Sequence, residues 1–239
     1  MKRCVLLCLA LIGAGAVLLA ADFWEKKEFT EWSDKDVARM MEDSPWSREV
    51  NILMAGRPSF SRAGGESGGG GGFEGGGGGG GRGGRGGGGL GDSELARPAL
   101  SLHVRWMSAL PVKQALVRSS MSSEQQMDER TQQFLKRAET HYLVAVSDIP
   151  ARMVNASEGT ERFVQAARIE RGNHGEPLAP ERVEARPERN RMTLYFFFPR
   201  TNPITLEDKN VEFVLNAEQL EIKRKFKLQE MVYQGKLEL

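Results

Sequence analysis

The stretch VEFVLNAEQLEIKRKFKL, residues 211–228, decides the fold class. In its second half, apolar residues stand at positions 220, 222, 226 and 228, and charged residues stand between them: Glu221, Lys223, Lys225 and Lys227. A period of two is typical of a strand with one buried and one solvated face. Asn216-Ala217-Glu218 separates this strand from the apolar run 211–215. The stretch therefore predicts a β-hairpin, which is a unit of antiparallel sheet.

The sequence before the hairpin adds strands and helices. Further strands are expected at 100–107, 141–147 and 192–198, and a last short strand at 236–239. Helices are expected at 111–117, 123–137 and 160–167. The charged, proline-bearing segment 168–191 is expected to form a loop with at most one edge strand. Residues 92–239 are thus predicted to form an α+β domain with a single mixed or antiparallel sheet and two or three helices.

A tryptophan-bearing arm, residues 22–58, precedes this domain. It contains three of the four tryptophans of the chain: Trp24, Trp32 and Trp46. Ser33 can cap a short helix at 34–42, where apolar residues recur at helical spacing. Two interpretations of the arm stay open. It packs on its own domain, or its exposed aromatic residues dock on another protein or on a component of the cell envelope.

Residues 59–91 form a glycine-rich segment between the arm and the domain. Glycine has no side chain to bury and much backbone freedom to lose, so we expect a disordered linker. Gly-x-Gly-x-x-Gly patterns match here trivially, without the strand and helix that a cofactor loop requires. The Gly-x-Ser-x-Gly match at 65–69 lacks the strand-to-helix turn of a nucleophile, and the RGG-like stretch at 81–86 has only two arginines.

Residues 1–21 have the pattern of a secretory signal peptide, with Lys2 and Arg3 before an apolar run. The run at 4–21 is also long enough to remain as an N-terminal membrane anchor. In either case we expect the chain to be exported, as a periplasmic or secreted protein or as one anchored by residues 4–21. Both cysteines, Cys4 and Cys8, lie in this leader. The exported part is therefore predicted to contain no disulfide and no thiolate metal site.

Four short motifs lie on the arm and the domain: FTEW at 29–32, SPW at 44–46, FPR at 198–200 and GKLEL at 235–239. In these motifs, around Trp32, Pro45-Trp46, Pro199-Arg200 and the C-terminal tail, the chain resembles an uncharacterised family of small exported bacterial proteins. The resemblance covers the arm and the domain but not the glycine-rich segment. That family has no known activity, so the resemblance implies export and assigns no site residue.

The composition offers few candidates for chemistry. The net charge is +1, with 33 basic and 32 acidic residues, so no field attracts nucleic acid and no nucleic-acid partner is expected. The three histidines are His103, His141 and His174. The first two lie on predicted strands and could approach each other, but two histidines without a third ligand make a weak metal site. The sequence therefore assigns no catalytic, metal-binding or cofactor-binding residue, and no cofactor is expected.

Six residues remain as candidates for binding a partner: Trp24, Trp32, Trp46, Lys223, Lys225 and Lys227. The three lysines could form a basic strip for an anionic envelope polymer, although a solvated sheet face is the simpler interpretation. The function expected from the sequence is a non-enzymatic binding or structural module of the cell envelope. The alternative is an envelope hydrolase with a carboxylate site that the sequence does not locate.

Overall fold

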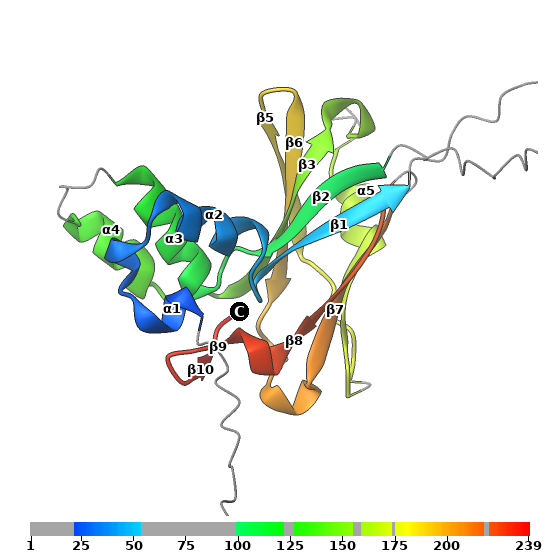
Figure 1. Cartoon of the computed structure of the whole chain (residues 1–239). Coiled ribbons are helices and arrows are strands. Elements are labelled where there is room, and N and C mark those ends of the chain that lie inside the picture. Colours follow the sequence, from blue (N-terminus) through cyan, green and yellow to red (C-terminus); the bar gives the residue numbers. More distant parts are fainter. Residues whose placement is uncertain (1–21, 54–98, 122–126, 155–158, 174, 218–219) are drawn as a thin grey trace, which may run out of the picture.

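The computed structural model describes residues 22–53, 99–121, 127–154, 159–173, 175–217 and 220–239. These residues form an α+β fold of mostly antiparallel sheets, which confirms the predicted class (Figure 1). The leader, the glycine-rich segment with its three motifs, and His174 lie outside the described residues. Within these ranges no helix is long and apolar enough to cross a membrane.

The main sheet has five strands in the order β1-β2-β3-β6-β5, and every neighbouring pair is antiparallel. The strands are β1 (Ser47–Leu53), β2 (Ala99–Trp106), β3 (His141–Pro150), β6 (Arg191–Pro199) and β5 (Arg182–Glu188). Strand β3 is central, as its apolar run predicts, because central strands are covered on both faces.

A second sheet, rather than an extension of the first, holds the hairpin predicted at residues 211–228. Its order is β4-β7-β8, with β4 (Ala167–Arg171), β7 (Asn210–Ala217) and β8 (Leu220–Lys227). The prediction of a single sheet is wrong in this respect. The segment 168–191, expected to hold one edge strand at most, contributes to two strands, β4 and β5. Strand β4 is hard to predict because only Ala167 and Ile169 of its residues are buried and charged residues surround them. Backbone pairing with β7 makes it a strand.

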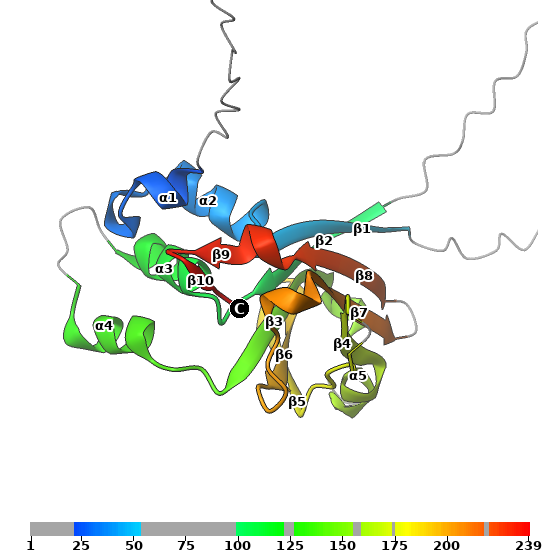
Figure 2. The same cartoon turned by 90° about the horizontal axis from the view of Figure 1, so that it is seen from below.

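The two sheets bury their apolar faces against each other. The rings of Phe196 on β6 and Phe213 on β7 meet edge to face, with centroids 5.1 Å apart. Trp106 on β2 and Phe226 on β8 meet in the same way at 5.8 Å. Strands β1 and β8 lie side by side where the two sheets approach (Figures 1 and 2). A small ladder of β9 (Val232–Tyr233) and β10 (Lys236–Leu237) follows β8.

The arm belongs to the same fold as the domain. Strand β1 pairs with β2 from Ser47 opposite Arg105 to Leu53 opposite Ala99, so residues 54–98 connect the two strands of one hairpin. In the described residues the predicted boundary between an arm and a separate domain does not exist. Sequence patterns missed this pairing because it joins strands on either side of the long glycine-rich segment.

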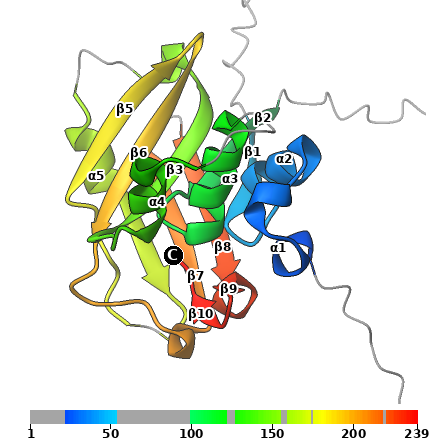
Figure 3. The same cartoon turned by 90° about the vertical axis from the view of Figure 1, so that its left-hand side faces the viewer.

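Four of the five described helices gather at one end of the sheets, and the fifth lies apart from them (Figure 1). The helices are α1 (Phe23–Lys26), α2 (Asp34–Glu42), α3 (Leu110–Ser120), α4 (Glu129–Lys136) and α5 (Glu161–Ala166). Helix α2 begins with the expected cap, because Ser33 Oγ accepts a 3.2 Å hydrogen bond from the Asp36 N–H. Helices α2 and α3 lie side by side, and α5 packs near β5 and β7 (Figures 1 and 3).

Candidate functional site

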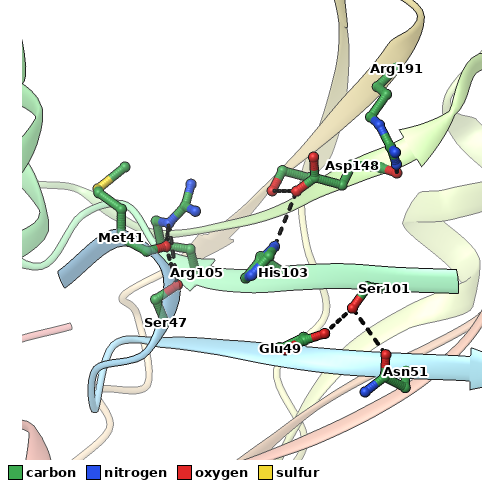
Figure 4. A network of polar contacts seen from close by, with 10 residues as sticks. Met41, Ser47, Glu49, Asn51, Ser101, His103, Arg105, Asp148 and Arg191 are labelled. Atoms are coloured by element: carbon green, nitrogen blue, oxygen red, sulfur yellow. Dashed lines mark hydrogen bonds and ion pairs between the residues drawn. The ribbon is translucent and has the colours of Figure 1, made fainter. Parts of the chain in front are cut away.

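A β-bulge interrupts strand β3 on the outer face of the main sheet, the face turned away from the second sheet. The register with β6 slips between Val146 and Ile149, and Asp148 within the slip has a φ of 69°. A left-handed backbone is uncommon for a residue with a side chain, and strained residues cluster at functional sites. Bulges also re-aim side chains. This one directs the Asp148 carboxylate toward the neighbouring strand β2 (Figure 4).

Among the described residues, partners bind only one oxygen of the Asp148 carboxylate. Its Oδ2 lies 3.1 Å from Nδ1 of His103 on β2, and it accepts a 3.0 Å hydrogen bond from Ser147 Oγ. The Asp148 backbone carbonyl accepts a 2.6 Å bond from Arg191, which holds the bulge to β6. Oδ1 makes no bond to a described residue, and the side chain is 43% exposed. A carboxylate oxygen thus remains free on the outer face of the sheet.

Arg105 lies two residues beyond His103 on the same face of β2. Its Nε donates a 2.7 Å hydrogen bond to the Met41 carbonyl and a 3.3 Å bond to Ser47 Oγ. Burial lowers the pKa of Arg105, and the negative charge of Asp148 opposes that shift. Arg105 forms no ion pair with a described residue, and its terminal nitrogens point away from Met41 (Figure 4). The Arg105 guanidinium is therefore held in place on the outer face of the sheet and has no carboxylate partner among the described residues.

The same face continues across β3 to β6. Ala145 stands between Arg105 on β2 and Tyr195 on β6 in the strand register. Burial raises the pKa of the Tyr195 phenol, and the Arg186 guanidinium lies 5.1 Å from the centre of its ring. The Thr193 side chain is also part of this face. The residue is only 3% exposed, and its Oγ1 has no hydrogen-bond partner among the described residues. Such orphaned hydroxyls are rare in folded proteins.

Two hollows lie elsewhere on the surface. One, of about 540 Å³, is lined mainly by apolar side chains beside β5 and borders residues outside the described set. The other, of about 550 Å³, lies between the N-terminal helices and the segment after β8. Its arginines are already paired, Arg39 with Asp22 at 2.9 Å and Arg48 with Asp43 at 3.0 Å. The outer sheet face is therefore the stronger candidate site.

The three arm tryptophans that the sequence singles out are core residues. Trp32 and Trp46 are fully buried, and Trp24 is 5% exposed. The Trp46 indole packs edge to face on Trp24 and on Tyr233, and its Nε1 donates a 2.8 Å hydrogen bond to the Glu238 carbonyl. In the folded chain these rings do not form a surface that a partner could reach. The arm packs on its own domain because its aromatic rings complete the core.

Lys223, Lys225 and Lys227 are exposed on one face of β8, as the alternation predicts. Carboxylates lie close to two of them. Glu212 of β7 stands directly opposite Lys225, and Lys227 forms a 2.9 Å ion pair with Glu230. Opposite charges across a ladder stabilise the sheet and reduce the net positive charge of the strip. The basic strip is therefore a weaker candidate for an anionic partner than the sequence suggests.

His103 and His141 do not meet. His103 stands opposite Ser147 on β3, whereas His141 lies six residues earlier on that strand, about 20 Å away along it. His141 instead bonds Glu181 at 2.7 Å. The described residues contain no group of three side chains suited to a metal ion.

Sequence reasoning found His103 as a strand residue but missed its site. The bulge at Asp148 falls just beyond the predicted strand 141–147, and alternation carries no signal for an inserted residue. No protein-family model, curated protein or solved structure matches the chain. Function is therefore inferred from the geometry of the described residues.

Proposed function

We propose that this protein is an exported, non-enzymatic binding module of the cell envelope, and that its partner docks on the outer face of the main sheet. One observation carries the proposal: polar groups that bond to no described residue converge there. They are the terminal nitrogens of Arg105 and Oδ1 of Asp148. Leaving such groups unsatisfied costs free energy, and a docked partner would satisfy them.

The setting suits binding. The groups stand on paired strands, which hold them more firmly than a loop would. Tyr195 and the Arg186 guanidinium stacked on it add aromatic and cationic area, which is enriched in binding hot spots.

The order of the hydrogen bonds argues against hydrolysis by a serine that a histidine activates. In such a site the nucleophilic hydroxyl bonds to its base. Ser147 instead donates to the Asp148 carboxylate, to which His103 is also bonded, so serine and histidine share one acceptor. The arrangement fixes a carboxylate in place and leaves Ser147 without a bond to His103.

The test is retention of envelope components on immobilised residues 22–239. A sheet-face variant, Tyr195→Ala with Arg186→Ala, removes exposed area without touching the bulge. The matched control replaces the lysines of the second sheet: Lys223→Gln, Lys225→Gln and Lys227→Gln.

We expect the sheet-face variant to lose most of the retained material and the control to keep it. Equal retention by all three proteins, with circular dichroism showing each folded, would reject the outer face as the docking surface. Loss in the lysine control alone would point to the basic strip.

A further inference from the structure

Two opposite charges on the outer face of the main sheet lie near each other and do not pair. Asp148 is close enough to oppose the lowering of the pKa of Arg105, yet no ion pair joins them. Both stand on the same side of the sheet (Figure 4). Opposite charges with free side chains would be expected to meet, because a direct bidentate pair is the strongest arrangement open to them.

Both groups are held in place by other bonds. The Met41 carbonyl and Ser47 Oγ tie the Nε edge of the Arg105 guanidinium. The bulge and two hydrogen bonds to Oδ2 fix the Asp148 carboxylate. The bound partner of Asp148 is His103, which lies two positions from Arg105, a spacing of roughly 7 Å along a strand. The protein thus keeps a cation and an anion separated, each with a free side.

We propose that this gap binds a zwitterion, a ligand whose carboxylate takes the terminal nitrogens of Arg105 and whose ammonium group takes Oδ1 of Asp148. The ligand class is an amino acid, either free or as the end of an envelope peptide. This assignment deepens the proposed function and rests on it. The planar fork of a guanidinium matches a carboxylate with two parallel hydrogen bonds.

The surrounding charges select against simpler ions. The Glu42 and Glu188 carboxylates act on Arg105 together with Asp148, so a doubly charged phosphate would meet more repulsion than a carboxylate does. A lone amine would leave the guanidinium unpaired, and a lone carboxylate would leave Oδ1 unpaired. A zwitterion satisfies both charged groups at once. The buried Thr193 hydroxyl stands on β6 beside the bulge, on the same face.

Isothermal titration of residues 22–239 with a probe series tests the assignment. The zwitterions are glycine, 4-aminobutyrate, 6-aminohexanoate and the dipeptide Ala-Ala, and the single-charge controls are acetate and ethylammonium. We expect at least one zwitterion to bind about tenfold more tightly than either control, which corresponds to one added charged contact. The free amino acids and the dipeptide separate the two sources. Zwitterions that bind no better than acetate would overturn the assignment.

Two variants locate the site. Arg105→Gln should lower the affinity for the best-binding zwitterion about tenfold or more. Asp148→Asn should lower that affinity to the level of acetate and leave the affinity for acetate unchanged. Lys223→Gln, on the other sheet, should change nothing. If circular dichroism shows that Arg105→Gln does not fold, the Asp148→Asn variant still tests the site. Unchanged zwitterion binding by Asp148→Asn would exclude the site. Envelope retention without zwitterion binding would reject this ligand class and leave the proposed docking face standing.

Discussion

The replacement Asp208→Asn should destabilise the fold more than any single change to its surface charges. Asp208 is fully buried and receives two hydrogen bonds of 2.8 Å from Arg171 of β4, whose side chain is 8% exposed. Its Oδ2 also accepts a 2.9 Å bond from the Thr205 N–H. Arg171 in turn reaches Asn202 at 2.8 Å, so the pair fastens the segment 200–209 to β4.

The magnitude follows from the uncompensated charge that the variant leaves. Removing one partner of a buried ion pair costs about 3–5 kcal/mol, a large part of the roughly 5–15 kcal/mol by which a domain is stable. For a fold of this size such a loss lowers the melting temperature by roughly 10 °C. Arg168→Gln is the matched control, because its 2.6 Å pair with Glu170 on the same strand is about 40% exposed on both sides. That variant should change the free energy of unfolding by no more than about 1 kcal/mol.

The pH dependence supplies a second readout. Burial raises the pKa of Asp208, but the hydrogen bonds from Arg171 and the Thr205 N–H outweigh it, so the folded pKa lies below the ordinary value of 3.8. The unfolded chain therefore binds the proton first. The stabilisation is complete above the unfolded pKa and is lost as the pH falls through the folded one. Urea unfolding from pH 7 to pH 2 should show a steeper loss below pH 4 in the wild type than in Asp208→Asn. The reasoning would be refuted if the free energy of unfolding fell equally steeply below pH 4 in the wild type and in Asp208→Asn. It would also be refuted if Asp208→Asn lowered that free energy by less than about 1 kcal/mol at pH 7.

Three further outcomes are expected. Trp46→Ala should cost about 3–5 kcal/mol in urea unfolding, because a fully buried indole leaves a cavity and the Glu238 carbonyl loses its donor. Replacing residues 54–98 by Asn-Gly should keep the circular dichroism spectrum and add about 2–3 kcal/mol of stability, since it closes the same hairpin with a far shorter loop; a lost fold would show that the segment does more than connect. Gly172→Ala should destabilise by about 1–3 kcal/mol in thermal unfolding, because its Cβ would stand 2.6 Å from the backbone oxygen of Asp208.

The elements with strong local periodicity could be predicted from the sequence. Ile222 and Phe226 of β8 are buried and the lysines between them are exposed, because a period of two assigns the faces of a strand whatever its neighbours are. Helix α2 was predictable for a similar reason, since Ser33 and the helical spacing act within a few residues.

Features that depend on distant partners could not be predicted. Ile169 is the single fully buried side chain inside the charged strand β4, and backbone bonds to β7 create the strand. The bulge at Asp148 depends on register against β6, which alternation does not encode. The orientation of the Arg105 guanidinium depends on Met41 and Ser47, which bind its Nε and leave its terminal nitrogens free of described partners. Both residues come from the other side of the glycine-rich segment, so the sequence around Arg105 does not indicate this arrangement.

The contribution of the arm to the candidate site is therefore indirect. Its tryptophans suggested an aromatic surface for a partner, but Trp46 is buried against Trp24 and bonded to the C-terminal tail. Ser47 follows Trp46 directly and pairs with Arg105 across the β1–β2 ladder. Burying the indole fixes the first residue of β1, and that residue, together with the carbonyl of Met41 near the end of α2, fixes the guanidinium. The arm thus positions the proposed ligand-binding arginine through its packing and its main chain, while its aromatic rings remain inside the protein.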